Sequence, residues 1–199
     1  IHLEGYDPTY KGHQGQIKKA ATLIKNAKRP LIIAGAGVLK SGAMDELKEL
    51  AEKAQIPVTN TLVGLGGFPG DHELALGMVG MHGSVAANNS TDEADLVIAA
   101  GIRFHDRITG HPDFFCKKAK IIHIDIDPAE IDKNVTINVP IVGDLKQVLT
   151  ELNALVEPTT HEAWLEQIRE WQAEYPMVIP ESKNGVLHAQ YVLSELNKI

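Results

Sequence analysis

The sequence predicts an α/β protein, a doubly wound, Rossmann-like parallel sheet of about six strands with helices on both faces and a C-terminal helical connector. Two observations lead to this prediction. Short apolar runs rich in β-branched residues alternate with stretches whose apolar residues recur at helical spacing, as in βαβ units. Within the runs, polar residues do not alternate with apolar ones, which is typical of strands covered by helices on both faces.

Six runs account for the predicted strands. Most are bounded by glycine, proline or polar residues. They comprise residues 31–34, 56–59, 74–79, 96–100, 121–126 and 140–142.

Helices are expected where apolar residues fall on one face of a helical spacing. Ser41 is expected to precede the second of these helices. The predicted helices comprise residues 14–27, 44–54, 84–89, 145–156, 164–175 and 186–199.

We expect three parts along the chain: a linker over 1–13, a central nucleotide-binding domain over 14–156, and a connector over 157–199 that leads into a further domain. In the connector, both tryptophans lie on one face of a helix that Pro176 ends, so this face should pack on the same domain or on a neighbour. The chain opens with Ile1 and ends inside a predicted helix, so we expect it to be a piece of a longer protein.

Composition excludes several classes of protein. The chain has 19 Lys and Arg against 26 Asp and Glu, a net charge of -7, which disfavours a nucleic-acid partner. No apolar run approaches the roughly 18 residues that span a bilayer, so no membrane partner is expected. The single cysteine, Cys116, excludes a disulfide within the chain and favours a reducing, cytoplasmic location.

The turn Gly35-Ala36-Gly37 follows the first predicted strand and is a candidate for nucleotide binding. Ligands of doubly wound sheets bind at the carboxyl ends of strands, and glycines let a diphosphate approach the main chain. A full NAD fingerprint would have a third glycine where Lys40 stands, and an acid at the end of the second strand. The NAD(P) dehydrogenase hypothesis is therefore weak, and a tight turn without a ligand is the structural alternative.

Polar residues also follow the later strands. Arg103 and Arg107 leave the fourth strand, and arginine suits the oxygens of a diphosphate. Asp125 and Asp127 close the fifth strand and Asp144 follows the sixth, where carboxylates would accept hydrogen bonds from ribose or adenine groups. Because parallel strands end at one edge of the sheet, we expect these residues to converge on one extended ligand.

Each of these residues also has a structural alternative. Asp127 would cap a following helix, and Arg107 would pair with Asp106. A purely structural spacer is the corresponding alternative for the whole domain, and its strand-end crevice would be filled by side chains.

No catalytic constellation is visible in the sequence. His82 is a poor candidate for a general base, and no metal-ligand spacing occurs. Gly70-Asp71 and Asn88-Asn89 imitate a thiamine diphosphate and Mg²⁺ motif, but the spacing is too short. We therefore expect neither catalytic residues nor metal ligands in this chain.

Four segments of the chain carry distinctive motifs: residues 61–66, 77–83, 101–110 and 123–131. The most specific are the Met-His-Gly block at 81–83 and the Arg-Phe-x-Asp-Arg block at 103–107. In their order and spacing, over roughly residues 10–156, the segments resemble the central domain of acetolactate (acetohydroxyacid) synthases, a thiamine diphosphate-dependent family.

The resemblance implies a transferase that decarboxylates pyruvate on thiamine diphosphate and joins the product to a second 2-ketoacid, in branched-chain amino acid biosynthesis. It implies that the catalytic residues, thiamine diphosphate and Mg²⁺ belong to N- and C-terminal domains of the same parent chain, so this chain alone should be inactive. It also implies a cytoplasmic homodimer or homotetramer with a possible regulatory small subunit.

FAD, with no net redox role, is the cofactor that the resemblance implies for this domain. The implied FAD residues divide among the diphosphate, flavin and ribose–adenine regions, and two further residues would lie near the substrate channel. They are Gly35, Ala36 and Gly37 at the diphosphate; Thr61, Leu62, Met81 and His82 at the flavin; Gly101, Arg103, Asp125, Ile126 and Asp144 along the remainder; and Asp106 and Arg107 at the channel.

Two positions depart from the family's pattern: Ala36 replaces a common glycine, and His105 a common aspartate. The alternatives are the central domain of an FAD-free catabolic acetolactate synthase, a glyoxylate carboligase or a pyruvate oxidase. A more distant alternative is an NAD-dependent deacylase-like domain, whose zinc module would need four cysteines where only Cys116 exists.

Overall fold

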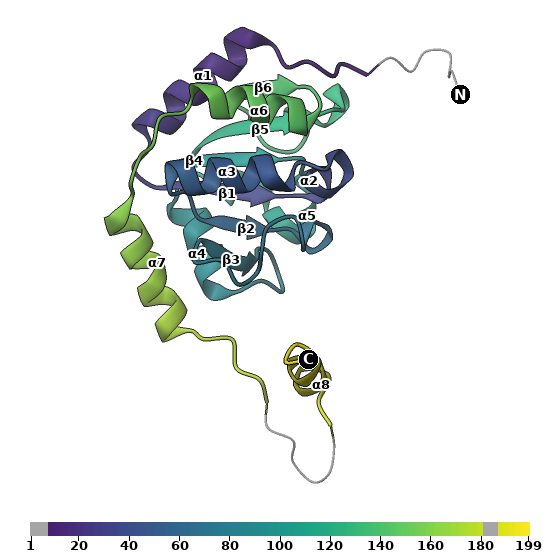
Figure 1. The fold of residues 1–199 in the computed structure, drawn as a ribbon, viewed down its shortest axis with the longest axis vertical. Coiled ribbons are helices and arrows are strands. Elements are labelled where there is room, and N and C mark those ends of the chain that lie inside the picture. Colours follow the sequence, from purple (N-terminus) through teal and green to yellow (C-terminus); the bar gives the residue numbers. More distant parts are fainter. Residues whose placement is uncertain (1–7, 181–186) are drawn as a thin grey trace, which may run out of the picture.

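The computed structural model describes residues 8–180 and 187–199 and shows a six-stranded sheet with helices on both faces (Figure 1). All neighbouring strands are parallel, and their order is β3-β2-β1-β4-β5-β6. The order reverses between β1 and β4, which is where doubly wound sheets bind ligands. The strands are β1 Pro30–Ala34, β2 Val58–Asn60, β3 Ala75–Met78, β4 Leu96–Ala100, β5 Lys120–Asp125 and β6 Val139–Val142.

The helices are α1 Gln14–Asn26, α2 Ala36–Ser41, α3 Met44–Ala54, α4 Val85–Glu93, α5 Asp106–Thr109, α6 Leu145–Leu155, α7 Glu162–Glu174 and α8 Ala189–Leu196. Helices α2 to α5 lie in connections between strands, whereas α1 precedes the first strand and α6, α7 and α8 follow the last. Three short 3₁₀ turns lie in the connections at residues 62–64, 112–114 and 128–130.

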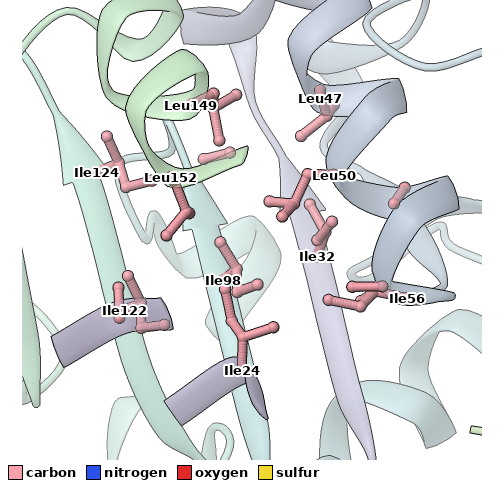
Figure 2. Close-up of a cluster of buried hydrophobic side chains, with 14 of the residues drawn as sticks. Ile24, Ile32, Leu47, Leu50, Ile56, Ile98, Ile122, Ile124, Leu149 and Leu152 are labelled. Carbon is pink, nitrogen blue, oxygen red and sulfur yellow. The ribbon is translucent and has the colours of Figure 1, made fainter. Parts of the chain in front are cut away.

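Two apolar layers hold the helices on the sheet, because successive strand side chains point to opposite faces. On one face, α1, α3 and α6 pack against Ile32, Ile98 and Ile122, as Figure 2 shows. On the other face, α4 and α7 pack against a second cluster that includes Ile33 and Val97. The predicted architecture is confirmed.

The predicted helix over 44–54 is confirmed as α3, and Ser41 precedes it as expected. The structure adds a helix that the sequence did not predict: Ser41 is the last residue of α2, which begins at Ala36 after the N-cap Gly35. Gly42 ends α2 with a left-handed φ of 64°, a conformation that glycine adopts without strain. The apolar stripe therefore begins in a separate helix, α3.

The connector helix α7 docks on the same domain, which confirms one of the two expected arrangements. Trp164 is buried, and its Nε1 donates a hydrogen bond of 3.0 Å to the carbonyl oxygen of Pro30. Trp171 meets Trp164 edge to face, with ring centroids 5.8 Å apart. The buried part of the stripe ends before Tyr175, which is exposed.

The two ends of the chain are only partly described. Residues 1–7 of the expected linker and 181–186 of the expected connector, whose last residue is the first of the last expected helix, lie outside the described residues. The linker's remainder reaches the sheet, because the carbonyl oxygen of Tyr10 accepts a 2.8 Å hydrogen bond from the Asp144 N–H. Helix α8 has no buried residue. The division into a linker, a central domain and a connector to a further domain stays a prediction.

Candidate functional site

A cavity of about 700 Å³ lies at the carboxyl edge of the sheet, within the usual range for small-molecule sites. The register brings the ends of four strands level: Ala34 pairs with both Asn60 and Ala100, and Ala100 pairs with Ile124. The residues after these strands therefore share one rim. The predicted cofactor residues that line the cavity are Ala36, Gly37, Thr61, Gly101, Arg103, Asp125, Ile126 and Asp144.

The backbone segments that follow β1 and β4 are in direct contact beside the cavity. The N–H of Gly35 donates to the Ala100 carbonyl (2.9 Å), and that of Gly37 to the Gly101 carbonyl (3.1 Å). A Cβ on Gly35 would lie 2.2 Å from the Gly101 oxygen, so Gly35 is enclosed by this contact and does not line the cavity. Glycine at position 35 therefore allows the backbones after β1 and β4 to approach each other. This close approach also holds Gly37 and Gly101 at the cavity wall.

Thr61 contributes an unsatisfied polar atom to the wall. Its N–H donates to the Ala34 carbonyl at 2.9 Å, which fixes the residue at the end of β2. Its Oγ1 is buried and has no hydrogen-bond partner among the described residues. Because buried hydroxyls in proteins are nearly always paired, this unpaired hydroxyl beside the cavity is a candidate contact for a ligand.

Asp125 sits at the end of β5 with a side chain only 11% exposed. Its Oδ1 accepts a 2.9 Å hydrogen bond from the Asp127 N–H. Burial raises the pKa of the Asp125 carboxyl, and the negative charge of Asp127 adds to that rise. The Asp127 N–H, the charge of Arg103 and, when it is protonated, His123 oppose the rise. The second oxygen, Oδ2, makes no hydrogen bond among the described residues; the nearest ring nitrogen, His123 Nε2, is 3.9 Å away.

Two of the aspartates have structural roles. Asp127 caps the 3₁₀ turn that follows it, with Oδ1 accepting from the Ala129 N–H at 2.9 Å, so the structural alternative for Asp127 is confirmed. Asp144 caps α6 through a 3.1 Å hydrogen bond from the Gln147 N–H to its Oδ1, yet it also lines the cavity. Its other oxygen remains available to a ligand.

Several lining residues were not anticipated from the sequence. Lys40 is exposed on α2 and, with Arg103, places a second cation at the wall. It was missed because no helix was expected between the first strand and Ser41; Gly42, read as a helix C-cap, would have revealed α2. The remaining unanticipated lining residues are Leu39, Ser41, Val63, Ile102, His105, Ile108, Ile124 and Leu145.

The other predicted site residues do not line this cavity. Leu62 and Met81 are 70% and 72% exposed, and His82 is also exposed. The Met81 N–H donates to the Arg107 carbonyl at 3.2 Å, so this loop meets α5 beside the cavity. The expected pairing of Arg107 with Asp106 takes another form, because Asp106 Oδ1 accepts the Arg107 backbone N–H at 2.9 Å.

No metal site or membrane span emerges from the described parts of the chain. Over residues 8–180 and 187–199, no group of three or more His, Cys, Asp or Glu side chains is arranged to hold a metal ion. None of the helices described there is long and apolar enough to cross a bilayer. Asn88, part of the imitation of a Mg²⁺ motif, is used inside the fold, where its amide exchanges two hydrogen bonds with the backbone of Gly80.

A second cavity of about 650 Å³ lies between α4, α7 and the residues that precede β1. Its lining includes Arg29, Asp92, Trp164 and Trp171, and none of the predicted site residues. It lies at the amino-terminal edge of the sheet, so tryptophan fluorescence reports on this region and not on the carboxyl edge.

Known proteins resemble this chain over its whole described sheet. Residues 17–152 match the family described as "Thiamine pyrophosphate enzyme, central domain". The chain is 57% identical over 173 residues to a probable acetolactate synthase large subunit of Methanocaldococcus jannaschii, covering 85% of the chain. It is 45% identical over 208 residues to an acetolactate synthase of Mycobacterium avium and 38% identical over 205 residues to an acetolactate synthase large subunit of Haemophilus influenzae, in both cases over its full length. The chain spans 29%, 33% and 36% of the lengths of these three relatives, respectively.

Proposed function

The chain belongs to the thiamine pyrophosphate enzyme central-domain family, and from this premise we propose that it is the FAD-binding central domain of an acetolactate synthase large subunit. The names of the similar proteins support the parent enzyme. In that enzyme, pyruvate is decarboxylated and condensed with a second 2-ketoacid, a step toward valine, leucine and isoleucine. This chain is expected to bind cofactor and to contribute no catalytic residue.

The observation that supports FAD binding most is the convergence of five strand ends on one cavity of about 700 Å³. Its wall carries the cations Lys40 and Arg103 together with the carboxylates Asp125 and Asp144. A dinucleotide has the matching chemistry, because its diphosphate is anionic and its ribose hydroxyls donate hydrogen bonds. The spacer alternative is disfavoured, because it predicts a crevice filled by side chains.

The residues present fit the cofactor. Arg103 would bind diphosphate oxygens, and the free oxygens of Asp125 and Asp144 would accept from ribose or adenine groups. Thr61 Oγ1, unpaired in the described structure, would pair with the ligand. When bound, the flavin would supply no net oxidation or reduction.

The rest of the enzyme would lie in other domains of the parent chain. Thiamine diphosphate, Mg²⁺ and the catalytic residues would belong there, in keeping with the lengths of the relatives. A homodimer or homotetramer, a regulatory small subunit and a cytoplasmic location complete the proposal. The family membership disfavours an NAD-dependent deacylase, whereas FAD-free members of the family remain the competing candidates.

A ligand titration tests the proposal. FAD, ADP, NAD and riboflavin are added separately to the purified chain and to the full-length parent protein, and binding is followed by flavin fluorescence and calorimetry. We expect FAD to bind more tightly than ADP or riboflavin, because it fills both halves of the cavity, and NAD to bind weakly. Binding of ADP without FAD by the full-length protein would favour a family member of the FAD-free type instead.

A further inference from the structure

His123 is a buried titratable residue beside the cavity that the proposed cofactor contacts do not use. It lies in β5, and its side chain is 0% exposed. Its neighbours Ile122 and Ile124 point to the opposite face of the sheet. A fully buried imidazole needs a hydrogen-bond partner to offset its loss of water.

The partner of His123 is a loop carbonyl. Its Nε2 lies 2.8 Å from the carbonyl oxygen of Ile102, the second residue after β4. Because a carbonyl only accepts, the proton must sit on Nε2. Nδ1 has no partner in the described structure, and burial lowers the pKa of His123 against the opposing effects of that carbonyl, Asp125 and Glu130. The imidazole is therefore neutral near pH 7, with one defined tautomer.

The segment that His123 binds has an uncommon backbone. Gly101 and Phe104 both have positive φ, 63° and 46°, and a positive φ is strained for phenylalanine. The Phe104 ring packs edge to face on the imidazole, with centroids 4.9 Å apart, and Asn134 Nδ2 donates to the Phe104 carbonyl at 3.2 Å. His123 thus contacts the Gly101–Phe104 segment at Ile102 and Phe104, while Asn134 binds its last carbonyl.

We propose that His123 is a positioning residue for the cavity: through the Ile102 carbonyl and the Phe104 ring, it holds the Gly101–Phe104 segment in the conformation that presents Arg103 to the ligand. Arg103 itself is exposed at the wall and makes no ion pair among the described residues. Its position therefore depends on the backbone that carries it. The ligand part of this inference rests on the proposed function, whereas the holding of the segment rests on geometry alone.

A matched pair of variants tests the reach of the side chain. In His123→Gln, the side-chain amide nitrogen lies about as far from the backbone as Nε2 of histidine, so it can still donate to the Ile102 carbonyl. In His123→Asn, the side chain carries a similar amide but is too short to reach that carbonyl. Amide hydrogen exchange of residues 101–105 is measured in the ligand-free chain, with residues 31–34 of β1 as the internal reference. We expect His123→Asn to accelerate exchange in the segment by about tenfold or more and His123→Gln to restore most of the protection.

FAD affinity of the same proteins tests the consequence for the ligand. We expect the Kd for FAD to rise by about tenfold in His123→Asn and by much less in His123→Gln. In the Arg103→Ala background, the His123→Asn change should add little, because the group it positions is gone. An unchanged Kd in His123→Asn, or full additivity with Arg103→Ala, overturns the ligand part.

Two outcomes overturn the positioning role itself. One is equal acceleration of segment exchange by both variants, and the other is an Nδ1–H tautomer for His123 in the ¹⁵N spectrum of the unsubstituted chain. The spectrum needs no variant, so it decides the question even where His123→Asn does not fold. If the unsubstituted chain and the full-length parent bind no FAD, the proposed function fails, while exchange and tautomer still decide the role of His123.

Discussion

Gly37 and Gly101 are in direct backbone contact: the N–H of Gly37 donates to the Gly101 carbonyl at 3.1 Å, and a Cβ on Gly37 would lie 2.6 Å from the Gly101 Cα. Gly37 lies in the first turn of α2, shortly after β1, and Gly101 directly follows β4; the order of the sheet reverses between these two strands. Their contact joins the two segments next to the cavity, at the point where the strand order reverses. Any side chain at Gly37 would separate the two turns.

Gly37→Ala is expected to lower the free energy of unfolding by about 1–3 kcal/mol, because its methyl group meets backbone that cannot move aside cheaply. The Kd for FAD should rise as well, since both turns line the cavity. Thermal denaturation and FAD titration measure the two effects. The matched control is Gly70→Ala, whose Cβ would meet nothing within 4 Å; equal destabilisation by both substitutions would contradict the role of the contact.

Arg103→Ala is expected to weaken FAD binding by about tenfold or more, because it would remove the charged hydrogen bond that we propose Arg103 makes to the diphosphate. The melting temperature of the ligand-free chain should change little, since the side chain is exposed. Affinity for riboflavin, which lacks phosphate, should not respond. Arg169→Ala on α7, away from the carboxyl edge, is the control, and a similar loss there would indicate a general charge effect.

Thr61→Val and Thr59→Val are expected to act in opposite directions. Thr61 Oγ1 is buried and finds no partner in the part of the chain that the structure describes, so its removal should stabilise the ligand-free chain by about 1 kcal/mol while weakening FAD binding. Thr59 Oγ1 donates to the Gly77 carbonyl at 3.1 Å, so its removal should destabilise the chain by about 1–2 kcal/mol. Denaturant melts with and without FAD make the comparison. Destabilisation by Thr61→Val would show that its hydroxyl has a partner within the protein.

The stability of the chain is expected to fall as the pH drops below the ordinary histidine pKa of 6.5. Burial lowers the pKa of His123, opposed by the Ile102 carbonyl, Asp125 and Glu130, and burial likewise lowers the pKa of His161, opposed by Asp95. Between 6.5 and each lowered value, the unfolded chain binds more protons than the folded chain, so stability rises with pH.

Urea titrations at several pH values measure this dependence. Each histidine should contribute a slope of up to about 1.4 kcal/mol per pH unit. His123→Gln and His161→Gln should each flatten the curve, and the double variant should flatten it further. Slopes that neither substitution alters would assign the pH dependence to other groups.

Trp164→Phe is expected to destabilise the docking of α7 by about 1–3 kcal/mol, because the Pro30 carbonyl loses its buried partner. Trp171 is only half-buried, so Trp171→Phe is the milder control. The FAD affinity of both should match that of the unsubstituted chain, since the tryptophans lie at the amino-terminal edge. Proteolytic cleavage of the segment after α6 should be faster in Trp164→Phe than in Trp171→Phe or the unsubstituted chain. A loss of FAD binding in Trp164→Phe would contradict the prediction that the tryptophans at the amino-terminal edge do not affect the cavity at the carboxyl edge.

Much of the fold could be predicted because its signals are local. Six apolar runs correspond to the six strands, and the stripes over 14–27 and 145–156 correspond to α1 and α6 to within one residue. Helix α2 was missed because it is too short to show a stripe, and only Gly42 marks its end. Carboxyl-edge convergence could also be predicted, since it follows from parallel strands.

The sequence by itself determined the doubly wound sheet, its apolar strands and the polar residues after them, because those features depend on neighbours along the chain. Only the tertiary structure decided which of these residues share a wall: it encloses Gly35 under Gly101, leaves Met81 and Arg107 in contact beside the cavity, and brings in Lys40. The physical reason is that register and helix packing, which join residues far apart in the chain, set these distances, and no local pattern encodes them.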